Sequence, residues 1–171
     1  GQYTSDNQGY IYIEDLTTTG RFYLKELENE GYVPDTEMKT VYVTAGETTL
    51  VEWKNIPITA QIQVIKKSAD YNPTNGLPAG TLLEGAVFEI YDKANSLVDT
   101  IKSDQRGIAA SKPLPLGRYT IREVKAPANY GVSDTVLNAY LEHEGQIVTF
   151  EVTNKALSTG VNITKTGPKE A

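Results

Sequence analysis

A lysine, a glutamate and an asparagine each follow apolar residues on one face of an expected strand. Side chains alternate between the two faces of a strand, so residues two apart share a face. By this rule Lys66, Glu123 and Asn154 each continue an apolar face. Their companions are Ile62 and Val64 for the lysine, Tyr119 and Ile121 for the glutamate, and Val148, Phe150 and Val152 for the asparagine. Because burying a lone charge costs several kcal/mol, we expect the three polar groups to meet inside the fold.

These three residue types can join two side chains covalently. Desolvation favours the neutral amine of a lysine, which makes Lys66 a candidate nucleophile. The side-chain amide of Asn154 is the electrophile. A buried carboxyl tends to hold its proton, so Glu123 would polarise the amide carbonyl and shuttle protons. Attack of the amine with loss of ammonia would leave an amide cross-link, formed once per domain by proximity alone. The reaction needs no cofactor and no metal.

Each residue also has an ordinary interpretation. A bulge in the strand would turn Lys67 inward and leave Lys66 as an exposed lysine. Glu123 could pair with Arg122 or Lys125 on the surface, and Asn154 could simply end its strand as a turn residue. Trp53 and Phe150 are expected in the core, and the single histidine, His143, lies in an expected turn without a second histidine for a metal site.

The elements that must position the three residues are strands closed by Gly, Pro, Asn or Asp. With no convincing amphipathic helix, their spacing predicts an all-β fold, an antiparallel β-sandwich. The expected strands cover residues 60–67, 84–91, 97–102, 117–124, 134–141 and 147–154, with a weaker one near 107–111.

Several segments recur in the same order at a nearly constant spacing, which predicts tandem repeats of a domain. Residues 58–156 form one complete repeat, residues 1–57 the last part of a preceding one, and residues 157–171 the first strand of a following one. The incomplete neighbours repeat parts of the polar set as Glu26, Asn55 and Lys165. The matching pairs are Ser5–Gly9 with Ser103–Gly107, Gly20–Leu27 with Gly117–Val124, Thr48–Asn55 with Ile147–Asn154, and Ala60–Lys67 with Gly160–Gly167.

Composition narrows the class of protein. The chain has 171 residues, a net charge of −6 and no cysteine, so disulfides and thiolate metal sites are excluded. The negative charge argues against nucleic acid as a partner, and no apolar run is long enough to insert into a membrane. The only methionine is the internal Met38, so we expect the chain to be a piece of a longer protein.

The complete repeat resembles the collagen-adhesin B-type (CnaB-like) domains of Gram-positive surface proteins and pilins. The resemblance rests on IQVIKKSAD, LEGAVFEIYD, SDQRGI, LGRYTIREVKAPANY and VTFEVTNK, which together span residues 62–155. It implies a transthyretin-like or reverse-immunoglobulin sandwich. It also implies an isopeptide bond from Lys66 to Asn154 with Glu123 as the assisting acid, formed within 58–156 and not within 1–57.

The resemblance implies a structural role, not enzymatic turnover. We expect a stalk repeat of an extracellular, cell-wall-anchored adhesin or pilus-like protein, with neighbouring repeats of the same chain as partners. The alternative is a binding module for a host extracellular matrix protein or a glycan, with loops 68–80 and 126–134 as candidates. An accessory domain of a secreted enzyme ranks last, because no catalytic constellation stands out. A further possibility is that the strand carrying Lys165 completes Glu26 and Asn55 of another molecule.

Overall fold

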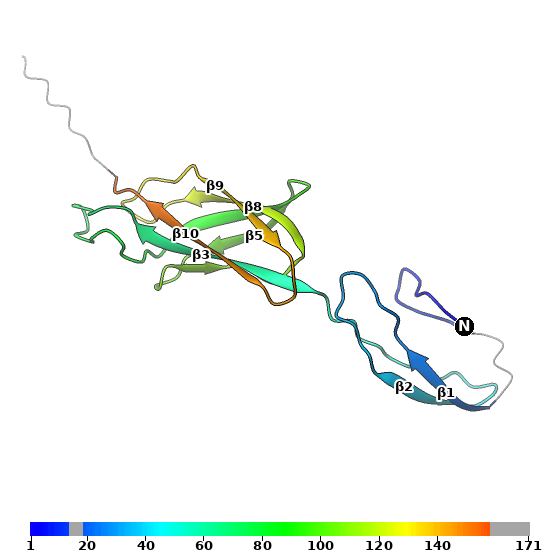
Figure 1. The fold of residues 1–171 in the computed structure, drawn as a ribbon. Coiled ribbons are helices and arrows are strands. Elements are labelled where there is room, and N and C mark those ends of the chain that lie inside the picture. The colour runs from blue at the N-terminus through cyan, green and yellow to red at the C-terminus, as the bar shows by residue number, and fades with distance from the viewer. Residues whose placement is uncertain (14–18, 158–171) are drawn as a thin grey trace, which may run out of the picture. The chain divides into compact units, whose positions relative to one another are not determined.

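The computed structural model describes residues 1–13 and 19–157 of the chain (Figure 1). The chain divides into two compact units, Gly1–Pro57 and Ile58–Ala171. Every regular element in the described residues is a β-strand. None of that part of the chain forms a helix long and apolar enough to cross a membrane.

The second unit is a sandwich of two sheets, as predicted. One sheet has the strand order β10-β3-β6, with β7 also pairing with β3, and the other has the order β5-β4-β8-β9. The strands are β3 (Thr59–Ser68), β4 (Val87–Asp92), β5 (Leu97–Lys102), β6 (Ile108–Ala110), β7 (Leu114–Pro115), β8 (Gly117–Lys125), β9 (Val136–Leu141) and β10 (Ile147–Asn154).

One strand pair of this unit differs from the prediction of an antiparallel sandwich. The first and last strands, β3 and β10, run parallel, whereas the other described pairs of the unit are antiparallel. Between β3 and β10 the chain crosses to the second sheet and back, and β10 then runs in the same direction as β3. The carboxyl ends of β3 and β10 therefore lie at the same end of the sandwich.

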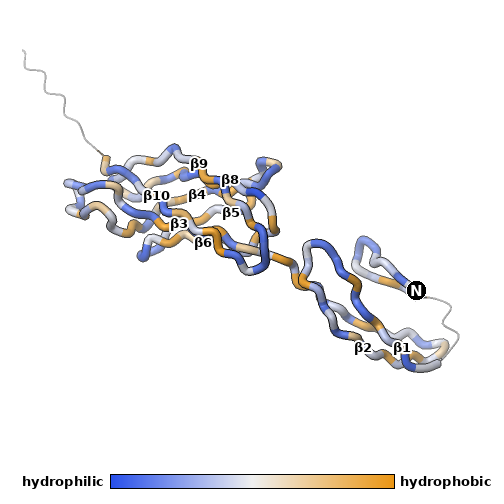
Figure 2. The backbone as a smooth tube through the Cα atoms, in the orientation of Figure 1, coloured by the Kyte–Doolittle hydropathy of each residue, from blue (hydrophilic) through white to orange (hydrophobic). Residues whose placement is uncertain are grey.

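The core of the second unit lies between the two sheets. Strand β3 alternates strictly between half-buried and buried residues, which is the pattern of a central strand with one face on a core. Figure 2 shows hydrophobic residues along β3 and β6. The buried hydrophobic cluster comprises Ala60, Ile62, Val64, Ala86, Phe88, Ile90, Ile101, Ala109, Leu114, Tyr119, Ile121, Ala139, Leu141 and Val152.

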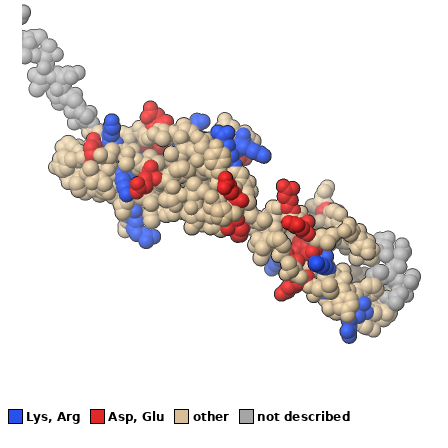
Figure 3. Space-filling view, in the orientation of Figure 1, with Lys and Arg blue, Asp and Glu red and all other residues tan. Residues whose placement is uncertain are grey.

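The visible surface carries charged side chains of both signs, acidic and basic (Figure 3).

Within residues 1–13 and 19–57, the first unit contains one two-stranded antiparallel sheet, β1 (Gly20–Lys25) with β2 (Met38–Val43). Its inward side chains, such as Phe22 and Leu24, are only half-buried, because no second sheet formed by these described residues covers them. The prediction of tandem repeats is therefore wrong for the described residues, which hold one complete sandwich. That residues 1–57 are the latter part of a preceding domain stays a prediction. Residues 158–171, most of the expected following strand, lie outside the described residues.

Candidate cross-linking site

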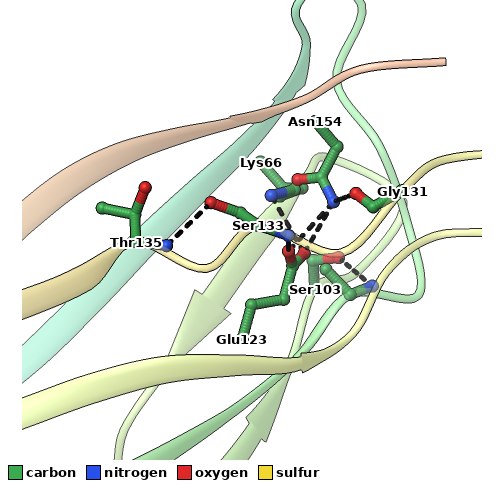
Figure 4. Close-up of polar contacts among 8 residues, drawn as sticks. Lys66, Ser103, Glu123, Gly131, Ser133, Thr135 and Asn154 are labelled. Atoms are coloured by element: carbon green, nitrogen blue, oxygen red, sulfur yellow. Dashed lines mark hydrogen bonds and ion pairs between the residues drawn. The ribbon is translucent and has the colours of Figure 1, made fainter.

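The three predicted polar residues lie together in the interior of the second unit (Figure 4). Lys66 comes from β3, Asn154 is the last residue of β10, and Glu123 comes from β8 in the opposite sheet. Their exposed fractions are 0% for Lys66, 7% for Glu123 and 2% for Asn154. The prediction that the three groups meet is confirmed by this geometry.

Strand register explains how Lys66 and Asn154 come together. In the parallel pair, Val152 lies opposite Lys66 and Asn154 lies opposite Ser68. Lys66 and Asn154 are thus diagonal neighbours on the inner face, close enough for a long side chain to reach its neighbour. An antiparallel β10 would have placed the asparagine at the far end of β3.

Glu123 reaches the same place because the alternation of β8 stays regular as far as this residue. Glu123 lies opposite Phe88 of β4, and the register shifts only beyond that pair, between Phe88 and Val87. Beyond the irregularity the alternation stops, and Lys125, which would otherwise follow Glu123 on the inner face, is exposed.

The alternative in which Lys67 points inward is excluded. Lys67 is half-exposed and forms an ion pair with Glu151 on β10, on the outer face of the sheet. Lys66, one residue earlier, is fully buried.

Glu123 is the centre of the polar cluster. Lys66 Nζ lies 2.9 Å from Glu123 Oε1, an ion-pair distance, although the amine makes no well-directed hydrogen bond. Asn154 Nδ2 donates to both carboxylate oxygens of Glu123, each at 3.0 Å. The backbone N–H of Ser133 donates to Glu123 Oε2 at 2.6 Å and fixes the carboxylate.

The orientation of the asparagine amide is set by a backbone carbonyl. Asn154 Nδ2 donates to the carbonyl oxygen of Gly131 at 2.7 Å. A flipped amide would place Oδ1 against this oxygen and against Glu123, so acceptors would face each other. Asn154 Oδ1 itself is buried and has no hydrogen-bond partner among the described residues. Glu123 therefore contacts the amide nitrogen, not the carbonyl oxygen that we expected it to polarise.

Burial changes the pKa of the Lys66 amine. Desolvation lowers the pKa of Lys66 from its usual value of 10.5, and the opposing attraction of Glu123 is smaller. The amine also lies 5.6 Å from the ring centroid of Phe88, which forms an apolar wall. A lowered pKa raises the share of the neutral, nucleophilic amine near neutral pH.

Gly131 and Ser133 were not predicted as site residues, since they act through backbone groups that residue types do not reveal.

The two loops that we expected as candidate ligand-binding loops, 68–80 and 126–134, are joined to each other by a hydrogen bond. Asn72 is fully buried and donates to the carbonyl oxygen of Asn129 at 2.9 Å, which joins loop 68–80 to loop 126–134. The described residues contain no group of three or more His, Cys, Asp or Glu that could hold a metal ion.

The residues predicted for incomplete sites are not brought together. Glu26 is half-buried, its Oε2 is buried, and that oxygen has no hydrogen-bond partner in the described part of the chain. Asn55 is exposed. Lys165 lies outside the described residues.

Comparison with known proteins agrees with this architecture. Residues 74–156 match the family model of the SpaA prealbumin-like fold domain. Over 53 residues the chain is 40% identical to the trypsin-resistant surface T6 protein of Streptococcus pyogenes serotype M6, covering 31% of this chain and 10% of that protein. The chain thus spans a small part of the curated relative that it matches.

Two solved structures show the same fold. The Bacillus anthracis TIE protein superposes with a TM-score of 0.65 and 29% identity, covering 91% of this chain and 28% of that one. GBS52, the minor pilin of Streptococcus agalactiae, superposes with a TM-score of 0.51, covering 95% of this chain and 71% of that one, and its 17% identity supports the fold alone.

These findings define the class. The second unit has a prealbumin-like fold and is similar to domains of Gram-positive surface proteins, so the predicted CnaB-like resemblance is confirmed. Such proteins are structural subunits, not enzymes.

Proposed function

We propose that residues 58–156 form a stalk domain of a cell-wall-anchored Gram-positive adhesin or pilus-like protein, cross-linked by an isopeptide bond between Lys66 and Asn154. The observation that carries the proposal is the buried contact of the lysine amine and the asparagine amide with one carboxylate. The resemblance to pilus and surface proteins supports the stalk role.

The reaction follows from the contacts. Transfer of a proton from the Lys66 ammonium to Glu123 gives a neutral amine, whose nitrogen bonds to the Cγ carbon of Asn154. Glu123 then passes its proton to Nδ2, the C–N bond of the amide breaks, and ammonia leaves. A second proton from the former amine returns to Glu123, which ends the reaction protonated. The contact of Glu123 with Nδ2 suits this transfer to the leaving group.

The bond would close most of the domain into one loop. If it acts like a disulfide, closure of a loop of roughly 90 residues stabilises the fold by about 4–5 kcal/mol through the unfolded state. Unlike a disulfide, the bond resists reduction, which suits an extracellular chain with no cysteine.

Intact mass spectrometry of the folded chain tests the proposal. We expect a mass lower than that of the sequence by one ammonia, and a tandem spectrum in which Lys66 and Asn154 share one fragment. The variant Lys66→Met should regain the full mass, whereas the control Lys67→Ala, on the outer face, should keep the loss. An unmodified mass for the folded natural sequence would refute the cross-link.

A further inference from the structure

Asn72 is a fully buried polar residue in loop 68–80, most of which is exposed. Burial of a polar side chain costs free energy unless its groups are hydrogen-bonded. Three groups of this residue bond within its own loop. Its backbone N–H donates to the carbonyl oxygen of Leu77 at 2.9 Å, and its own carbonyl accepts from the N–H of Gly76 at 2.7 Å. Its Oδ1 accepts from the N–H of Thr74 at 2.9 Å.

The fourth group, Nδ2 of Asn72, leaves the loop and donates to the backbone carbonyl of Asn129 at 2.9 Å. A flipped amide would place Oδ1 against this carbonyl and Nδ2 against the N–H of Thr74, so the orientation of the amide is fixed from both sides. Because the acceptor is a backbone group, the contact holds the path of loop 126–134 itself.

The backbone of segment 129–133 also orients two groups of the proposed cross-linking reaction (Figure 4). The carbonyl of Gly131 accepts from Nδ2 of Asn154 at 2.7 Å, and the N–H of Ser133 donates to Oε2 of Glu123 at 2.6 Å. Within the described part of the chain, three side chains from outside the segment hydrogen-bond to its backbone: Glu123, Asn154 and Asn72. The first two belong to the site, and the third does not contact the reacting atoms.

The segment is held from two directions. Two backbone hydrogen bonds, each of 3.0 Å, join Gly131 to Lys155 and Asn129 to Leu157. These bonds attach the segment to the residues that directly follow β10, the strand of the asparagine. Asn72 instead follows β3, the strand of the lysine, by four residues. Its side chain therefore sets the segment relative to the strand that supplies the amine.

We propose that Asn72 is a positioning residue of the cross-linking reaction, an inference that rests on the proposed function. By holding the carbonyl of Asn129, it fixes the backbone that orients the amide of Asn154 and the carboxylate of Glu123. A displacement of about 1 Å far from the reacting atoms can slow a reaction between held groups by about a hundredfold. Loss of the Asn72 contact should therefore slow bond formation even in a chain that folds.

The first test compares Asn72→Ala with a destabilising change at the other end of β3. The rate is that of ammonia loss from freshly synthesised chain, followed by intact mass, with near-ultraviolet circular dichroism to confirm folding. Asn72→Ala should react at least about tenfold more slowly than the natural sequence. Gly145→Ala is the control, because Gly145 has a φ of +75 and donates to the carbonyl of Thr59 at the amino end of β3. This control should react at a rate close to that of the natural sequence.

The second test restores the hydrogen bond by protonation. In Asn72→Asp an ionised carboxylate would face the Asn129 carbonyl without a proton to donate, whereas the protonated carboxyl would donate again. The rate of this variant, divided by that of the natural sequence at the same pH, should be low at neutral pH. The ratio should rise several-fold toward about pH 4, the usual range of an aspartate, which burial shifts upward. Asn95→Asp, in an exposed turn, should show a constant ratio.

The outcomes separate the positioning role from the cross-link itself. Asn72→Ala that reacts no more slowly than Gly145→Ala, or an Asn72→Asp ratio that stays constant with pH, overturns the positioning role alone. If Asn72→Ala does not fold, the ratio for Asn72→Asp decides. A natural sequence that folds and loses no ammonia refutes the cross-link, and the positioning role with it.

Discussion

The length of the second unit under tension separates a cross-linked stalk domain from an ordinary sandwich. Tension enters at the amino end of β3 and leaves beyond Asn154 at the carboxyl end of β10. With the bond in place, force runs along β3 to Lys66, crosses to Asn154 and leaves the domain. The chain enclosed between these two residues carries no load.

The variant Lys66→Met removes the amine while keeping an unbranched side chain of similar length. Extended at about 3.4 Å per residue, the chain from Thr59 to Asn154 reaches roughly 320 Å. Folded β3 spans roughly 33 Å at about 3.3 Å per residue. Unfolding of the variant should therefore lengthen the molecule by roughly 290 Å, whereas the bonded domain should show no such step.

Single-molecule stretching of the full chain, held at both termini, measures this difference. Lys67→Ala is the matched control, because it changes the neighbouring residue on the outer face and leaves the amine in place. If Lys66→Met exposes an unpaired carboxylate and fails to fold, the double variant with Glu123→Gln removes that charge. A full-length step in the natural sequence would refute the assigned path of force.

Three further predictions follow from the site. Glu123→Gln keeps the size of the side chain but cannot shuttle a proton, so its intact mass should retain the ammonia for at least a hundred times longer than the natural sequence. Because burial lowers the pKa of Lys66, the buried pair loses its shared proton to the solvent below pH 10.5, the usual lysine value, and Glu123 then has no proton to pass to Nδ2. Bond formation in freshly synthesised chain should therefore slow as pH rises toward 10.5, and a rate that keeps rising with pH, followed by mass spectrometry, would contradict this proton transfer. Gly107 has a φ of +74, and a Cβ there would lie 2.7 Å from the carbonyl oxygen of Lys66. In the bond-free Lys66→Met background, Gly107→Ala should cost more than the about 1–3 kcal/mol of positive φ alone. Gly145→Ala, with a φ of +75 and open space around it, should cost only that amount, as measured by denaturant unfolding.

The inward polar residues could be predicted because strand alternation is a strict geometric rule. Lys66 lies on the buried face of a strand that alternates without interruption over its 10 residues. Glu123 obeys the same rule because the irregularity of β8 falls after it. A bulge a few residues earlier would have moved the glutamate to the surface and made the prediction wrong.

The direction of β10 and the role of the backbone could not be predicted in the same way. Alternation of apolar residues is the same for a parallel and an antiparallel strand, so it cannot show that β10 runs alongside β3. Every residue has a backbone carbonyl and nearly every residue has a backbone N–H, so residue types cannot single out those of Gly131 and Ser133. Only the fold directs these two groups to Asn154 and Glu123. The tandem arrangement failed for a different reason: likeness of sequence in 1–57 does not supply a second sheet.

Before the bond forms, the site contains groups that burial disfavours. The Lys66 amine has one ion-pair contact and no well-directed hydrogen bond, and Asn154 Oδ1 has no partner among the described residues. Each such group weakens the unreacted fold. The proposed reaction would replace the ion pair and the amide with a neutral amide and a protonated carboxyl, so no charge would remain inside. The burial that costs stability in the unreacted fold would therefore favour the cross-linked product.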